Sequence, residues 1–222
     1  MESAKVRAII TGATGMVGEG VLLECLNDPD VEQVLVINRK AGGVSHPKLR
    51  EILHGDFFDL APIESQLSGY SACFFCLGVS SVGMSDADYK RTTYDLTLNV
   101  GQVLAKLNPQ MTFCYVTGKS TDSSEKGGVA WARVKGATEN ALLRLFENGY
   151  MFRPGFMKAM PGQKNLKIYY KLFAWIYPIG RALYPAAFCT LQEVGRAMVN
   201  AATKGYSKRV LEVGDIVELA KG

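Results

Sequence analysis

Short apolar runs that recur along the chain constrain its fold more than any other feature. Continuous rather than alternating apolar sequence is typical of strands in a sheet that helices cover on both faces. Stretches with helical spacing of apolar residues separate several of these runs. The runs lie at 6–11, 34–38, 52–56, 72–78 and 111–117, the helical stretches at 17–27, 87–107 and 128–148, and further runs at 150–153 and 209–213, the last before a short helix from Asp215. The pattern predicts an α/β fold, with a doubly wound parallel sheet and helices on both faces.

Composition and charge favour one globular domain. The chain has 222 residues, of which 48% are hydrophobic, and no repeat or linker divides it, so we expect a single domain over 1–222. A net charge of +4 without clustered basic residues argues against a nucleic-acid partner.

The five cysteines indicate free thiols and a reducing compartment, since all but one lie inside apolar runs. Cys73 and Cys76 form C-x-x-C, but their odd separation along an extended strand directs the two thiols to opposite faces. No metal site or disulfide is therefore predicted. No secretory signal precedes the first apolar run, and a cytoplasmic location is expected.

The stretch 151–190 differs from the rest, because it carries six Lys or Arg residues, many aromatic residues and no Asp or Glu. We expect a small C-terminal helical cap at about 155–190, which packs apolar residues on the sheet and exposes a basic face. Peripheral contact with a membrane through 169–188 is the alternative. Lys171, Pro178 and Arg181 interrupt this segment too often for a transmembrane helix.

The sequence TGATGMVG at 11–18 links the first predicted strand to the first predicted helix. Gly12 permits a tight turn, Gly15 lets the backbone approach a pyrophosphate, and Gly18 lets the helix pack close to the strand. The N–H groups at the helix start then face the phosphates. This context predicts a Rossmann-type fold that binds a dinucleotide through Gly12, Thr14, Gly15, Met16, Val17 and Gly18.

The end of the second predicted strand reads Asn38-Arg39-Lys40, where a fold that prefers NAD would place a carboxylate. A guanidinium can instead bind a 2′-phosphate with a forked pair of hydrogen bonds, so the cofactor is predicted to be NADP rather than NAD. Asp56 ends the third predicted strand. It is assigned either to the adenine amino group or to capping of its own loop.

With these residues the sequence resembles the short-chain dehydrogenase/reductase superfamily. Within its atypical branch it is similar to the Tat-interacting-protein-like reductases and to bacterial proteins labelled nucleoside-diphosphate-sugar epimerases. The resemblance covers nearly the whole chain, and WARVKGATENALL is its most specific segment. The matching segments are TGATGMVG at 11–18, CLGVS at 76–80, YDLTLNV at 94–100, YVTGKSTDS at 115–123, WARVKGATENALL at 131–143 and MFRPGFM at 151–157.

The resemblance implies a Tyr-x-x-x-Lys pair, of which only the lysine is present. Lys135 matches the residue that holds the nicotinamide ribose and lowers the pKa of the phenol, whereas Trp131 occupies the tyrosine position. An indole N–H is not a useful general acid near neutral pH. Two further interpretations stay open: Lys135 forms a solvated ion pair with Glu139, and Trp131 belongs to the core rather than to the nicotinamide pocket.

The resemblance also assigns supporting residues. Thr117 and Ser120 are the candidates for the hydroxyl that steadies a substrate carbonyl. Asn99 matches an asparagine that supports a proton-relay water, although a surface role fits it equally well. Leu77 and Gly78, in CLGVS, are assigned to the cofactor site.

Two classes of function follow. The first is an NADP(H)-dependent oxidoreductase or epimerase that acts on an unknown small molecule and takes its acid from Tyr169, Tyr170 or Lys119. The second is a non-catalytic dinucleotide-binding protein that acts through a protein or membrane partner. The missing tyrosine favours the second class, and the otherwise intact site favours the first.

Overall fold

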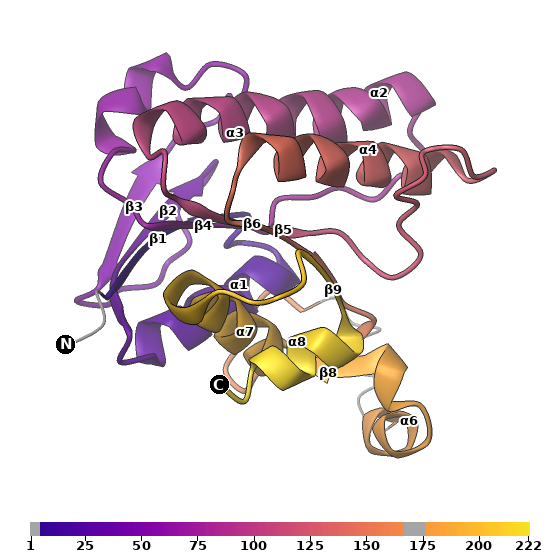
Figure 1. The fold of residues 1–222 in the computed structure, drawn as a ribbon. Coiled ribbons are helices and arrows are strands. Elements are labelled where there is room, and N and C mark those ends of the chain that lie inside the picture. The colour runs from indigo at the N-terminus through magenta and orange to yellow at the C-terminus, as the bar shows by residue number, and fades with distance from the viewer. Residues whose placement is uncertain (1–4, 167–175) are drawn as a thin grey trace.

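The computed structural model describes residues 5–166 and 176–222. Its main feature is a sheet of seven strands in the order β3-β2-β1-β4-β5-β6-β9, all paired in parallel (Figure 1). The strands are β1 (Val6–Thr11), β2 (Val31–Asn38), β3 (Leu49–Leu53), β4 (Ala72–Phe75), β5 (Thr112–Val116), β6 (Gly149–Arg153) and β9 (Val210–Glu212). The chain order of the strands reverses between β1 and β4. The predicted doubly wound Rossmann-type fold is thus confirmed.

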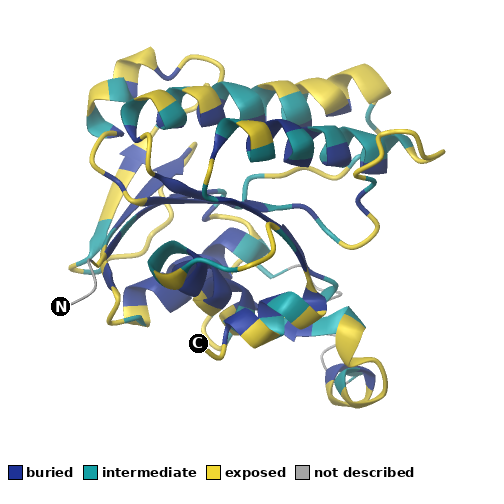
Figure 2. Cartoon of the chain, in the orientation of Figure 1, coloured by how far each residue is buried: buried dark blue, intermediate teal, exposed yellow. Residues whose placement is uncertain are grey.

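Helices cover both faces of this sheet, as Figures 1 and 2 show. One layer consists of α1 (Met16–Asn27), α7 (Leu191–Lys204) and α8 (Val213–Leu219). The other contains α2 (Asp86–Lys90), a π-helical turn η2 (Arg91–Asp95), α3 (Leu96–Leu107) and α4 (Ala130–Leu145), with the 3-10 helix η1 (Ala61–Gln66).

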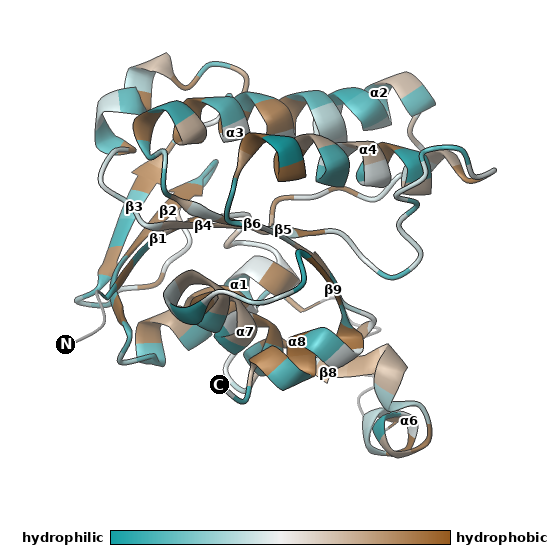
Figure 3. Cartoon of the chain, viewed as in Figure 1, coloured by the Kyte–Doolittle hydropathy of each residue, from teal (hydrophilic) through white to brown (hydrophobic). Residues whose placement is uncertain are grey.

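Two apolar cores result, one on each face. The neighbours Phe74 and Phe75 on β4 show the alternation, because Phe74 packs in the core under α1 and α7, and Phe75 packs in the core under α3 and α4. The strands at the centre of the sheet are mainly hydrophobic (Figure 3), which explains their continuous apolar sequence.

The predicted strands are shifted at several boundaries. β2 begins at Val31 rather than at 34, β3 covers Leu49–Leu53 rather than 52–56, and β4 ends at Phe75 rather than at 78. Exposed residues within β3 explain its shift, since it lies at the edge of the sheet and its apolar pattern is incomplete.

The cap segment is not purely helical. It contains β7 (Phe156–Lys158), which pairs in parallel with β8 (Phe188–Thr190), together with α6 (Tyr177–Leu183) and a 3-10 turn η4 (Pro185–Ala187). Tyr169 and Tyr170 lie outside the described residues. Within the ranges that the structure describes, no helix is both long and apolar enough to span a bilayer.

Candidate cofactor and catalytic site

The glycine loop between β1 and α1 is packed too tightly for side chains at two positions. A Cβ atom at Gly12, whose φ is +71°, would lie 2.8 Å from the backbone of Cys76, and one at Gly18 would lie 2.2 Å from the Gly12 carbonyl oxygen. Gly15 is the N-cap of α1, is exposed and supplies no side-chain cap. The first N–H groups of α1, at Met16 and Val17, therefore have no partner within the helix and form an open cradle for an anion.

A cavity of about 200 Å³ lies beyond the ends of β2, β3 and β4. Four residues that the sequence assigned to the cofactor, Arg39, Asp56, Leu77 and Gly78, meet there. The complete lining is Arg39, Gly55, Asp56, Phe57, Phe58, Leu77, Gly78, Val79, Thr92 and Leu96. Its apolar walls and polar edge suit a flat heterocycle attached to a charged group.

Asp56 has the loop-capping contact that was one of its two interpretations. Its Oδ1 accepts a hydrogen bond from the Phe58 N–H at 2.8 Å. The His54 ring stabilises the same turn, because its Nε2 lies 2.6 Å from the Asp56 carbonyl oxygen and 2.7 Å from that of Asp59. The second carboxylate oxygen of Asp56 has no hydrogen-bond partner among the described residues, and Asp56 lines the cavity.

A carboxylate also stands at the end of β2, which sequence reasoning missed. Glu51 Oε1 accepts hydrogen bonds from Asn38 Nδ2 at 2.7 Å and from the Gly42 N–H at 2.9 Å. It comes from the neighbouring strand, where parallel pairing sets Glu51 opposite Val36, two residues before Asn38 and on the same face. No local signal in the sequence reveals this contact, and the carboxylate is occupied in anchoring Asn38 and the following loop.

Lys135 on α4 reaches the carboxyl end of β5. Its Nζ donates a hydrogen bond to the Thr117 carbonyl oxygen at 2.7 Å. Burial lowers the pKa of the Lys135 ammonium, and the nearby Glu139 carboxylate partly offsets this shift. Trp131, one turn earlier, is half-buried and is not among the residues of either apolar core in the part of the chain that the structure describes.

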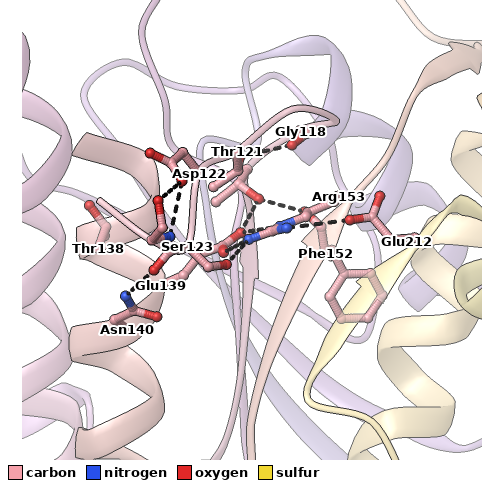
Figure 4. Close-up of polar contacts among 12 residues, drawn as sticks. Gly118, Thr121, Asp122, Ser123, Thr138, Glu139, Asn140, Phe152, Arg153 and Glu212 are labelled. Atoms are coloured by element: carbon pink, nitrogen blue, oxygen red, sulfur yellow. Dashed lines mark hydrogen bonds and ion pairs between the residues drawn. The ribbon is translucent and has the colours of Figure 1, made fainter. Parts of the chain in front are cut away.

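The alternative interpretation of Lys135, a solvated ion pair with Glu139, is wrong. Glu139 is fully buried, and its carboxylate forms a two-pronged ion pair with Arg153 of β6, in which Nε lies 3.0 Å from Oε1 (Figure 4). The Thr117 hydroxyl donates to the same Oε1 at 2.6 Å. Glu139 thus faces the sheet, where the Arg153 guanidinium and the Thr117 hydroxyl satisfy the hydrogen bonds of its buried carboxylate.

These contacts separate the two candidate hydroxyls. The Thr117 hydroxyl is buried and bound to Glu139. Ser120 is exposed in the loop after β5 and has a φ of +72°, a strained value for a residue other than glycine. Thr121 fixes this loop by donating from its hydroxyl to the Gly118 carbonyl oxygen at 2.8 Å. Of the two, only the Ser120 hydroxyl is open to a ligand.

Asn99 holds the turn that follows β3. Its Nδ2 donates to the carbonyl oxygens of Phe57 at 2.9 Å and Phe58 at 3.1 Å, both in the turn that lines the cavity. The contact spans 42 residues of sequence, and no local pattern predicts it.

The cysteines have no disulfide partners in the described part of the chain. Cys73 packs in the core under α3, and Cys76 packs against the opposite core under α1, as the spacing predicted. Burial raises the pKa of the Cys76 thiol to about 12, so this thiol is a poor nucleophile.

The fold and the loop define a dinucleotide-binding domain of Rossmann type. A family model described as the NAD dependent epimerase/dehydratase family matches residues 8–125. The chain belongs to this family, which confirms the resemblance to the short-chain dehydrogenase/reductase superfamily.

Known proteins share parts of this sequence and its fold. The chain is 28% identical over 156 residues to "Protein fmp52, mitochondrial" of Emericella nidulans, a match that covers 67% of this chain and 65% of the length of that relative. Helicobacter pylori ADP-L-glycero-D-manno-heptose-6-epimerase has a TM-score of 0.67 at 16% identity, with 98% of this chain and 82% of that chain covered. Bordetella bronchiseptica WbmF in complex with NAD⁺ has a TM-score of 0.66 at 17% identity, with 100% and 78% covered. At these identities the structural likeness establishes the fold.

Proposed function

We propose that this chain binds NADP(H) along the carboxyl edge of its sheet and acts as an atypical reductase or epimerase on a small molecule. The observation that carries the proposal is the arrangement of the open glycine cradle beside the cavity at the ends of β2, β3 and β4. These two sites fit the two parts of a dinucleotide, a pyrophosphate and an adenine.

In this proposal each part of the cofactor has its own protein groups. The N–H groups of Met16 and Val17 bind the pyrophosphate, and the free oxygen of Asp56 accepts from the adenine amino group. Arg39 lies at the same cavity and binds the 2′-phosphate, with a geometry that a guanidinium provides and a carboxylate does not. Bound NADPH supplies the hydride of a carbonyl reduction.

The remaining groups surround the reacting end of the cofactor. Lys135, fixed by the Thr117 carbonyl, holds the nicotinamide ribose. Ser120 donates a hydrogen bond to the substrate carbonyl. Because Trp131 supplies no acid, the proton comes from another group. Lys119 is exposed in the same loop as Ser120, and Tyr169 and Tyr170 belong to the cap sequence.

For the substrate and the cellular location we propose only a chemical class and a compartment. The Thermotoga maritima UDP-glucose 4-epimerase structure, with UDP-glucose bound, resembles this chain with a TM-score of 0.65 at 15% identity. We propose a small carbonyl or hydroxyl substrate for this chain. Five free cysteines suit a reducing compartment, for which we propose the cytoplasm.

Titration of the protein with NADPH, followed by nicotinamide fluorescence, tests the proposal. Gly15→Val should abolish binding, because the side chain occupies the space of the phosphates. The new Cβ lies 3.3 Å from the Gly12 carbonyl oxygen, so that oxygen must move by a few tenths of an ångström, and circular dichroism should show that the fold is retained. Gly214→Val is the matched control, since Gly214 is exposed on α8 with open space around it. Equal affinity for NADPH in the wild type, Gly15→Val and Gly214→Val would refute the assignment of the glycine loop to the phosphates.

A second candidate is a non-catalytic protein that binds NADP(H) and acts through a protein or membrane partner. Two observations favour it: Trp131 replaces the phenol, and the Thr117 hydroxyl is committed to Glu139. NADPH binding without turnover of any carbonyl in a broad panel would support this candidate.

A further inference from the structure

The turn that forms one side of the cavity is fixed by a side chain from a distant helix. Asn99, on α3, uses both hydrogens of its amide to hold the carbonyl oxygens of Phe57 and Phe58. The Phe58 N–H in turn donates to Asp56 Oδ1. A chain of hydrogen bonds therefore runs from Asn99 through one peptide unit to the carboxylate that lines the cavity.

The same helical segment also forms the opposite wall. Thr92 and Leu96 line the cavity, and Asn99 follows them at a spacing that places all three near one face of the helix. The π-helical turn η2 lies at this point, and such turns are frequent at functional sites. Arg91, in this turn, places its guanidinium carbon 5.2 Å from the centre of the Phe58 ring.

From these contacts we propose that Asn99 is a positioning residue for the adenosine half of the dinucleotide rather than a member of a proton relay. It fixes the distance between the helix wall and the turn at 56–58, and so presents the free oxygen of Asp56 to the adenine. This inference rests on the proposed cofactor site. It assigns Asn99 to the half of the cofactor that takes no part in the chemistry.

Calorimetric titration with adenosine 2′,5′-bisphosphate tests this inference, because this compound carries the adenosine half alone. Asn99→Ala should weaken its binding about tenfold, since two hydrogen bonds that hold the turn are lost. Asn99→Asp should weaken binding of the bisphosphate more, because a carboxylate of the same size places a negatively charged oxygen next to two carbonyl oxygens and repels them. Gln102→Ala, at an exposed amide on the same helix, should bind like the wild type.

The outcomes separate the inference from the function on which it rests. Unchanged affinity for the bisphosphate in folded Asn99→Ala and Asn99→Asp proteins would overturn the positioning role. If the wild type fails to bind both the bisphosphate and NADPH, the proposed cofactor site falls and the inference falls with it. Hydrogen exchange without any ligand provides an independent readout: in Asn99→Ala, amides at 56–59 should exchange faster, and those of α8 should not change.

Discussion

Trp131 stands four residues before Lys135, at the position that a phenol occupies in the proteins this sequence resembles. Its indole is half-buried beside a lysine whose amine is already held by the Thr117 carbonyl. The site thus retains the group that lowers the pKa of a phenol and lacks the phenol. This single residue decides between the catalytic and the non-catalytic candidate.

Trp131→Tyr should therefore create or increase carbonyl reduction with NADPH. General-acid assistance typically contributes about 10²- to 10⁴-fold, and Lys135 would lower the pKa of the new phenol. NADPH oxidation across a panel of small aldehydes and ketones measures the effect. Lys135→Ala in the Trp131→Tyr background should remove most of the gain. Rapid turnover by the native protein that falls in Trp131→Tyr would show that Trp131 itself serves the reaction.

Arg39 is the residue on which cofactor choice depends in this account. Arg39→Ala should reduce the preference for NADPH over NADH, because a charge-assisted hydrogen bond to the 2′-phosphate contributes about 1.5–3 kcal/mol. Lys40→Ala is the matched control, since Lys40 is the next exposed cation and does not line the cavity. Fluorescence titration of both cofactors provides the comparison. Equal affinities for NADPH and NADH in the unmutated protein would contradict the assignment.

At the scale of elements, the buried pair of Glu139 and Arg153 joins α4 to β6 (Figure 4). Glu139→Gln should reduce the free energy of unfolding by about 3 kcal/mol, because it leaves a buried guanidinium without its main counter-charge. Glu212→Gln should cost less than about 1 kcal/mol, since the Glu212 side chain is 52% exposed and lies 3.4 Å from Arg153. Urea unfolding measures both values. Equal losses of unfolding free energy in the two variants would show that the buried contact of Glu139 with Arg153 stabilises the fold no more than the exposed contact of Glu212 does.

The elements differ in how far the sequence predicts them. Apolar runs predicted β1 and β5 well, because helices cover both faces of these central strands. The helix α7 received no prediction, although Thr190 and Glu193 form a capping box at its start and could have revealed it. The strands β7 and β8 are only three residues long, which is too short for a periodic signal.

The candidate site also contains features that the sequence predicts and features that it does not. The glycine loop is local in sequence, and its turn geometry was predictable from Gly12, Gly15 and Gly18. The partners of Glu139 and Asn99 were not predictable, because Arg153 and the turn at Phe57 meet them only after the sheet has formed. A sequence pattern identifies which chemical groups the chain carries. The tertiary arrangement decides which of these groups are in contact.

At the scale of the whole molecule, the reversal of strand order between β1 and β4 brings the candidate groups to one edge. The ends of β2, β3, β4 and β5 lie on this edge together with the start of α1. Ligands of open α/β sheets bind at such a reversal. We therefore expect a single dinucleotide to lie across this edge, with its phosphates on the glycine loop and its adenine in the cavity.

Hydrogen exchange of the wild-type protein with and without saturating NADPH tests this binding mode. We expect slower exchange in three segments that are distant in sequence, at 12–18, 55–59 and 77–79, and unchanged exchange in α8. The loop at 118–121 should also be protected if the nicotinamide reaches Lys135. No protection in the first three segments at a saturating concentration of NADPH, or protection confined to α6 and α8, would contradict the account.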